Sequence, residues 1–272
     1  MNGTGKEYIQ IIANNMICLS KNLSDEYVNM FAAGAGLVVQ DYDSDTGLSD
    51  ILIRGMTKNH IIKDCWKSGK TFFYMDSGYF GNYKSVFNPN GRKHYHRIVK
   101  DNLQHTNIRE VPSDRWDGFG YTLATRKPGK HILLVTPSEK PCKFYGVKLD
   151  EWISKTLTEI QKYTDRPVII RTKAPRKERL THSIYEDLVN AHAVVTYNSV
   201  AAVESVITGV PAFTLAPTAA DPVCDKNLSL LENPSVFDKD LIHSWACHLA
   251  YGQFHIDEFK DGSAYKLLYE YS

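Results

Sequence analysis

The chain has 272 residues, a formal net charge of +1 and a hydrophobic fraction of 43%, so one large domain or two small ones can form a real core. A charge this close to zero excludes a general electrostatic field that would draw the whole molecule onto nucleic acid or an anionic membrane, so any such partner must meet a local patch. The five cysteines are scattered and form no Cys-x-x-Cys pair, which predicts free thiols and no zinc site. The sequence has no signal-peptide layout and no apolar run near the roughly 20 residues that span a bilayer, so we expect a cytoplasmic protein without a membrane partner.

The first half of the chain, up to about residue 125, mixes strand and helix signals. We expect elements at residues 9–16, 37–41 and 50–54, an amphipathic segment at 60–67, a buried strand at 71–76 and a helix at 95–103. The strand at 71–76 ends in the turn-forming sequence Asp76-Ser-Gly78. A polar segment with Pro and Gly at 125–129 resembles a linker.

After this linker, strands and helices alternate. We expect strands at 131–136, 167–171, 193–197 and 211–215, and helices at 149–163, 184–189 and 199–208. Such alternation predicts a parallel sheet covered on both faces, with the carboxyl ends of all strands at one edge, where ligands bind. The tail from 238 to 269 is expected to be helical, with packing residues Leu241, Trp245, Leu249 and Phe254.

The segment 193–204 is the most informative motif. A buried strand ends at a tight turn, Asn198-Ser199, and a short helix follows. The start of a helix offers unpaired backbone N–H groups and a positive dipole end, so this turn is a candidate anion site with Ser199 as N-cap. Glu204, further along the helix, is placed to accept hydrogen bonds from sugar hydroxyls. The alternative is an ordinary strand–helix–strand unit whose turn needs a cap.

Three groups of polar residues should meet at this edge, because each follows a strand. Together they offer cations, hydroxyls, N–H groups and a carboxylate, which suits a nucleoside diphosphate with the cations on its phosphates and the carboxylate on its ribose. The alternative for the segment that starts at Arg171 is a solvated basic loop. The candidate donor-binding residues are Ser138, Glu139, Lys140, Arg171, Lys173, Asn198, Ser199 and Glu204.

Asp76 is the candidate catalytic residue. A carboxylate at the end of a buried strand can act as general base toward a hydroxyl nucleophile, and the glycines at 78 and 81 let backbone approach a ligand closely. The alternative is a cap or turn aspartate.

A basic and aromatic stretch between residues 79 and 100 is the candidate acceptor site. Cations interleaved with aromatic rings suit a nucleic-acid backbone and an unstacked base. The alternative is a solvated helix face with packed tyrosines. His94 and His96, two residues apart on a helix, would not converge on a metal ion. The candidate acceptor-binding residues are Tyr79, Lys84, Arg92, Lys93, His94, His96 and Arg97.

These motifs resemble the two-domain glycosyltransferases of the GT-B type, and within them a phage-encoded group related to capsule-polysaccharide transferases. The resemblance rests on segments 73–79, 136–140, 165–173, 195–204, 209–213 and 248–254, with Glu258 and Gly262. It implies an α/β fold of two Rossmann-like domains facing a cleft, with a C-terminal helix crossing back to the first domain. The implied limits are 1–125 for the acceptor domain, 126–237 for the donor domain and 238–272 for the tail.

The resemblance also implies an activity. A hexosyl- or pentosyltransferase, arabinosyl transfer being one such activity, would move a sugar from a nucleotide sugar, for which UDP is the expected nucleotide, to 5-hydroxymethylcytosine in double-stranded phage DNA. No metal or other cofactor would be required, and the enzyme would work in the host cytoplasm. Two alternatives stay open: transfer to a surface polysaccharide or other glycan, and a non-catalytic module that binds nucleotide sugars.

Overall fold

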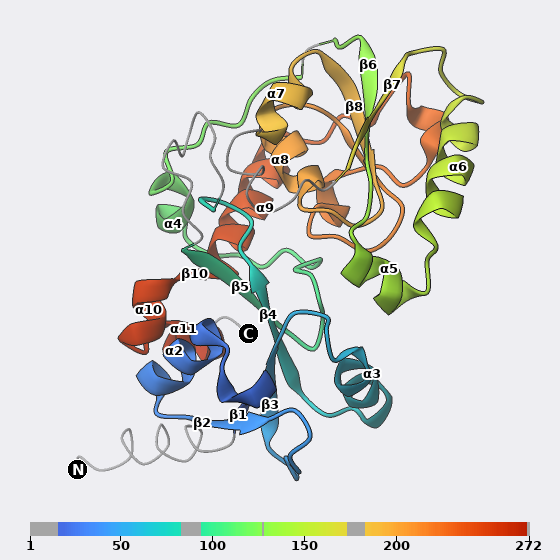
Figure 1. The fold of residues 1–272 in the computed structure, drawn as a ribbon. Helices are drawn as coiled ribbons and strands as arrows, with labels where there is room; N and C mark the ends of the chain where they lie inside the picture. The colour runs from blue at the N-terminus through green and yellow to red at the C-terminus, as the bar shows by residue number, and fades with distance from the viewer. Residues whose placement is uncertain (1–15, 83–93, 127, 173–182, 271–272) are drawn as a thin grey trace. The chain divides into compact units, whose positions relative to one another are not determined.

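The structure, a computed structural model, describes residues 16–82, 94–126, 128–172 and 183–270 (Figure 1). By its internal packing the chain divides into two units. Unit 1 holds the described residues up to Gly78, His94–Leu103 and those from Gly252 on, and unit 2 holds the described residues of Tyr79–Lys93 and Gln104–Tyr251. These boundaries are defined by internal packing and differ from the expected domain limits at 125/126 and 237/238. The expected limits stay predictions.

Unit 1 is built on a six-stranded sheet in the order β10-β5-β4-β3-β1-β2. The four strands β1 to β4 are parallel, whereas β5 is antiparallel to β4 and β10 is antiparallel to β5. The expected elements at 37–41, 50–54 and 71–76 are confirmed as strands. The strands are β1 (Met16–Ser20), β2 (Val38–Asp41), β3 (Asp50–Arg54), β4 (Phe72–Ser77), β5 (Tyr95–Lys100) and β10 (Gln253–His255).

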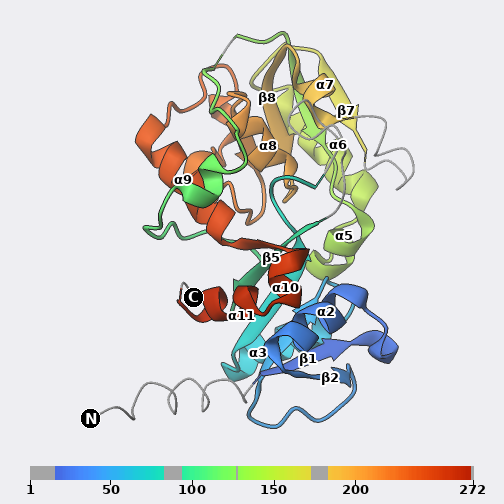
Figure 2. The same cartoon turned by 90° about the vertical axis from the view of Figure 1, so that its left-hand side faces the viewer.

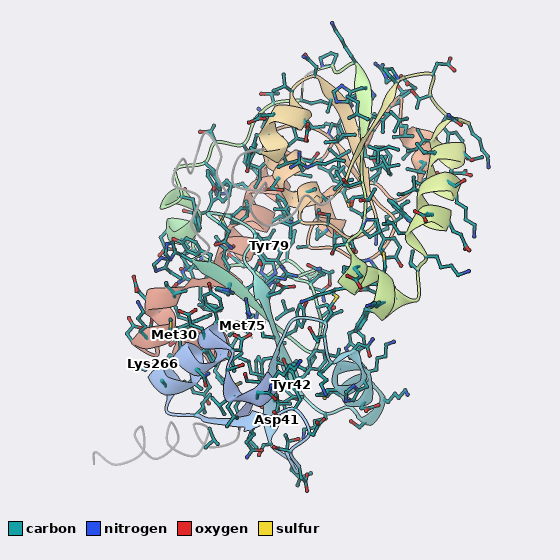
Figure 3. The ribbon with its side chains drawn as sticks, in the orientation of Figure 1. Met30, Asp41, Tyr42, Met75, Tyr79 and Lys266 are labelled. Atoms are coloured by element: carbon teal, nitrogen blue, oxygen red, sulfur yellow. The ribbon has the colours of Figure 1, made fainter. Side chains whose placement is uncertain are left out.

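One face of this sheet packs on helices from both ends of the described chain (Figure 2). Buried apolar side chains of α2, β1, β3, β4, β5, β10, α10 and α11 share a single cluster, which includes Met75 and against which the partly buried Met30 packs (Figure 3). Asp25 starts α2 by accepting hydrogen bonds from the N–H groups of Tyr27 and Val28. The helices of unit 1 are η1 (Lys21–Leu23), α2 (Glu26–Ala35), α3 (Asn59–Ser68), α10 (Ile256–Lys260) and α11 (Ser263–Glu270).

Unit 2 contains the expected parallel sheet, in the order β7-β6-β8-β9. Its alternation of strand and helix is confirmed, with ends that differ from the expected ones by at most three residues. The strands are β6 (His131–Val135), β7 (Val168–Arg171), β8 (Ala191–Thr196) and β9 (Ala212–Thr214). The helices are α4 (Asp114–Asp117), α5 (Glu139–Tyr145), α6 (Leu149–Ile160), α7 (Ile184–Leu188), α8 (Ala201–Ile207), η3 (Asp221–Val223), η4 (Leu228–Leu230) and α9 (Lys239–Tyr251). Among the described residues, every helix is too short or too polar to span a bilayer.

Two expectations about secondary structure are wrong. The helix expected at 95–103 is the strand β5, which pairs with β4 on one side and β10 on the other. The tail is not helical throughout, because Gln253–His255 leaves α9 and forms the strand β10. Trp245, Leu249 and Phe254 are buried as expected, whereas Leu241 is 37% exposed. Of the element expected at 9–16, only Met16, the first residue of β1, lies within the described residues.

A close backbone contact joins α10 to α2. A Cβ atom at Gly34 of α2 would collide with the Phe259 carbonyl oxygen and would lie 2.8 Å from the Lys260 carbonyl oxygen. Gly262, at a φ of +76°, ends the α10 turn against the Gly34 carbonyl. Glycine at 34 therefore permits the C-terminal segment to pack on the first helix of unit 1.

We predict that Gly34→Ala destabilises the protein by about 1–3 kcal/mol in urea unfolding, because the overpacking cost exceeds the helix propensity gained. Propensity alone would stabilise α2 by about 1 kcal/mol, so the sign of the change decides between the two effects. The matched control is Ala33→Gly on the exposed side of the same helix, which should cost about 1 kcal/mol. A Gly34→Ala protein more stable than the wild type would contradict the contact.

Candidate functional site

The sheet of unit 2 has a topological switch point between β6 and β8. The chain leaves β6 through α5 and α6, and α6 packs on one face with Trp152 and Ile160 against Leu134 and Val195. It enters and leaves β8 through α7 and α8, which pack on the opposite face (Figure 1). Neighbouring strands whose connections depart to opposite faces leave a crevice at their carboxyl ends, where ligands of open α/β sheets bind.

Ser138 and the pair Asn198-Ser199 lie at this point of the sheet. Ser138 precedes α5 in an extended conformation, and its side chain makes no capping hydrogen bond there. The Ser199 hydroxyl accepts a hydrogen bond from the Ala201 N–H at 3.2 Å. The N-cap of α8 is Val200 and not Ser199 as expected, because the helix begins two residues later than expected. Asn198 is 8% exposed and bonds the Tyr145 hydroxyl. The Ser138 hydroxyl is therefore more readily available to bind a ligand than the Ser199 hydroxyl, which already accepts the Ala201 N–H.

Arg171 and Glu204 lie within electrostatic reach of each other. Arg171 is the last residue of β7, and Glu204 lies in the first turn of α8. Burial raises the pKa of Glu204 to about 7, although the Arg171 charge opposes the rise. Burial lowers the pKa of Arg171, and the carboxylates of Glu204 and Glu186 counter that effect. A carboxyl group with a pKa near neutrality can both donate and accept hydrogen bonds at physiological pH.

The helix α7 supplies further groups to this cluster, which the sequence analysis did not identify. Asp187 forms an ion pair with Arg171, and both side chains are about four-fifths buried. Burial raises the pKa of the Tyr185 hydroxyl, and the Glu204 charge adds to the rise. The signal was present in the sequence, because the adjacent acids Glu186-Asp187 come shortly after the basic segment that begins at Arg171.

The remaining donor candidates differ in what the structure says of them. Glu139 forms an exposed ion pair with Lys143 at 2.7 Å, and Lys140 is exposed. Lys173 lies outside the described residues. Within the part of the chain that the structure describes, no group of three or more His, Cys, Asp or Glu side chains is placed to hold a metal ion.

Asp76 lies near the carboxyl end of β4 in unit 1, and several contacts fix its carboxylate. The buried Tyr74 hydroxyl donates to its Oδ2 at 2.8 Å, and the Ser77 N–H donates to its Oδ1 at 2.7 Å. Arg97, opposite it on β5, lies 3.6 Å from Oδ2 and donates to the Ser77 carbonyl at 2.6 Å. The Asp76 side chain is nevertheless 38% exposed. The carboxylate is held by neighbours and still reaches solvent, as a general base must.

The described acceptor candidates are mostly buried. His96 is fully buried between the rings of Tyr27 and Phe259, and the Arg97 side chain is 5% exposed. His94 is half-buried with its ring 5.3 Å from that of His255. The reason is that the segment forms the internal strand β5, in which residues 96–99 are buried, whereas the expected helix would have had an exposed face. Lys84, Arg92 and Lys93 lie outside the described residues.

Tyr79, labelled in Figure 3, belongs to unit 2 and contacts one of two neighbouring buried histidines there. It is 4% exposed, and its hydroxyl lies 3.1 Å from Nδ1 of His105. The His105 ring meets the His248 ring edge-on at 5.4 Å. His248, on α9, is 2% exposed, and neither of its ring nitrogens has a hydrogen-bond partner among the described residues. Burial, with a smaller contribution from the Arg109 charge, lowers the pKa of His248 to about 4.

The comparisons with known proteins identify the fold. No protein-family model and no curated protein matches the sequence. Two solved structures of KpsC from Thermosulfurimonas dismutans are similar in fold. The beta Kdo 2,4 transferase aligns with a TM-score of 0.53 at 10% identity, over 86% of this chain and 89% of that chain. The beta Kdo 2,7 transferase aligns with a TM-score of 0.52 at 11% identity, over 95% and 100%.

The expected fold class is confirmed. The chain has a GT-B-like α/β fold of two Rossmann-like units, and its C-terminal segment from Gly252 on returns to unit 1. At 10–11% identity this likeness concerns the fold alone.

We predict that acidification destabilises the protein through His248. Above its ordinary pKa of 6.5 the ring is neutral in both the folded and the unfolded chain. As the pH falls from 6.5 toward 4, His248 becomes protonated in the unfolded chain and stays neutral in the folded protein. The free energy of unfolding therefore falls by up to about 1.4 kcal/mol per pH unit, or about 3 kcal/mol over the whole range. His248→Leu should remove this part of the slope in urea unfolding, and His243→Leu, at an exposed position of the same helix, should keep it. Equal slopes for all three proteins would contradict the assignment.

Proposed function

We propose that the chain is a glycosyltransferase that moves a sugar from a nucleotide-sugar donor to a hydroxyl group of a polysaccharide or other glycan. The observation that carries the proposal is the cluster of Arg171 and Glu204 at the carboxyl edge of the unit 2 sheet, beside the switch point, in a GT-B-like fold. The fold is shared with two KpsC structures named as beta Kdo transferases, which supports a glycan as acceptor.

In this proposal unit 2 binds the donor. Arg171 and the Ser138 hydroxyl bind the diphosphate, together with Asn198, Ser199 and the basic segment that begins at Arg171. The Glu204 carboxyl group binds the ribose hydroxyls, and its pKa of about 7 suits an exchange of hydrogen bonds with them. Glu139, Lys140 and Lys173 stay predicted donor residues, and a UDP-sugar is the first donor to test.

Asp76 of unit 1 acts as the general base. The acceptor oxygen attacks the anomeric carbon while the bond between that carbon and the phosphate oxygen breaks, and the acceptor proton passes to the Asp76 carboxylate. Tyr74 and Arg97 orient the carboxylate during this step. The negative charge of the leaving nucleotide is met by Arg171 and backbone N–H groups.

The DNA acceptor has less support than a glycan. His96 and Arg97, which were expected to contact phosphates, are buried, and Lys84, Arg92 and Lys93 lie outside the described residues. Lys100, at the end of β5, is the exposed cation of that stretch among the described residues. Duplex DNA that contains 5-hydroxymethylcytosine is therefore tested as the comparison acceptor in the assay.

We expect the wild-type chain, incubated with a panel of nucleotide sugars, to transfer a sugar to an oligosaccharide acceptor, detected by mass spectrometry. Asp76→Asn should lower turnover by about 10²–10⁴-fold while leaving donor affinity unchanged, because the amide keeps the shape of the side chain and cannot take the proton. The control is Asp50→Asn, at the opposite end of the neighbouring strand β3, which should keep full activity.

Each other outcome of this assay counts against a part of the proposal. Transfer to hydroxymethylated duplex DNA and to no glycan would reverse the choice of acceptor. Donor binding without transfer or donor hydrolysis would indicate a binding module. Loss of donor affinity in Asp76→Asn would refute the role of Asp76.

We predict that removing Arg171 and removing the charge of its partner Asp187 change donor affinity in opposite directions. Arg171→Ala should weaken donor binding by about 10- to 100-fold in calorimetry, which corresponds to about 1.5–3 kcal/mol for a hydrogen bond to a charged group. Asp187→Asn should strengthen donor binding, because Asp187 competes with the diphosphate for the same guanidinium. The matched control is Arg166→Ala, which removes an arginine–carboxylate pair with Glu232 before β7 begins and should leave donor affinity unchanged. Parallel losses in Arg171→Ala and Asp187→Asn would mean that the ion pair only supports the fold.

A further inference from the structure

A pocket of about 520 Å³ lies in unit 2 beside α6, away from the cluster around Arg171 and Glu204. Its walls come from α6, from the residues after β8 and β9, and from the segment 226–228. Arg171 pairs with Asp187 of α7, and the Glu204 charge acts on Tyr185 of the same helix, which packs on the opposite face of the sheet. The volume is within the range of about 300–1,000 Å³ for small-molecule sites. None of the residues assigned to the donor lines this pocket, although Tyr197 directly precedes Asn198 in the chain.

Three aromatic rings line the pocket. Trp152 and Tyr197 meet nearly edge to face, with ring centroids 6.0 Å apart at 82°, which fixes both rings. Tyr163, just beyond the end of α6, also lines the pocket and is 37% exposed. The faces of aromatic rings carry negative charge density and attract C–H groups, which the faces of a sugar ring present in rows.

The charged side chains that line the pocket are paired with other described residues, except for one lysine. Lys226 is paired with Asp221 at 2.9 Å, and Glu159 is paired with Lys162 at 2.6 Å. Lys155, on the turn of α6 between Trp152 and Glu159, is exposed and has no ion pair or hydrogen bond with any described residue. The pocket thus combines ring faces with a single available positive charge.

We propose that this pocket binds a glycan that carries a carboxylate group, with Tyr163 and Trp152 contacting the sugar rings and Lys155 contacting the carboxylate. Resting on the proposed function, the inference assigns the pocket to a distant part of the acceptor chain. A glycan held at the α6 face gains effective concentration at the reaction centre without taking part in the chemistry. Long acidic acceptors then bind more tightly than short ones, and transfer to a short acceptor is independent of the pocket.

The test measures binding without donor and without transfer. Saturation-transfer NMR and calorimetry with the full chain use a trisaccharide of galacturonic acid and a neutral galactose trisaccharide as probes. We expect the acidic trisaccharide to bind more tightly and its affinity to fall with added salt. Lys155→Glu should weaken its binding about tenfold, because an attraction becomes a repulsion, and Tyr163→Ala should weaken both probes. Lys239→Glu, at an exposed position of α9, is the charge-matched control and should bind as the wild type does.

Several results would overturn the inference: no binding of either probe, equal affinity for both, an unchanged affinity in Lys155→Glu, or displacement of the acidic trisaccharide by a nucleoside monophosphate. A Lys155→Glu protein that unfolds at a lower urea concentration than the wild type is replaced by Lys155→Gln, for which a smaller loss of affinity is expected. Binding of the acidic trisaccharide by a chain that transfers to no acceptor would refute the proposed function and leave the pocket standing. Normal transfer with unaltered kinetics on long acidic acceptors in Lys155→Glu would refute the pocket alone.

Discussion

The direction of the strands in unit 2 is the constraint on which its candidate site depends. Four parallel strands bring all their carboxyl ends to one edge, and the change of face between the connections of β6 and β8 opens that edge at a single point. Ser138 and Ser199 lie at this point because each follows one of the two strands. The chemistry of the edge is therefore a consequence of the sheet's topology and not of any one motif.

Burial turns the charges at this edge into a coupled group. A guanidinium removed from water needs carboxylates nearby, and α7 supplies Asp187 directly to Arg171. The same loss of water raises the pKa of Glu204 toward neutrality. An anionic ligand that displaces Asp187 meets a cation already held in place, so less conformational entropy is lost on binding. In unit 1, Tyr74, Ser77 and Arg97 hold the Asp76 carboxylate in a comparable way.

The two units differ in how far their structure can be predicted from sequence. In unit 2 the spacing of hydrophobic residues is unambiguous, because short apolar runs alternate with amphipathic segments. Every expected strand of this unit is present. In unit 1 the local pattern of the segment 95–103 predicts a helix. It forms the internal strand β5, where Arg97 is buried beside Asp76 and His96 between rings. The cost of burying Arg97 is offset by partners on β4, which are 20 or more residues away in sequence.

The sequence by itself determined the α/β class, the parallel sheet of unit 2 and the strand ends at which Arg171, Ser199 and Asp76 lie, because period and turn chemistry are local properties of the chain. The tertiary structure alone decided which side chains meet: Asp187 with Arg171, His248 with His105, and the rings of Trp152 and Tyr197 with Lys155 around one pocket. It also decided that β10 leaves the tail to pair with β5. These contacts join residues far apart in sequence, and they form only when burial of the sheet faces brings separate helices to the same layer.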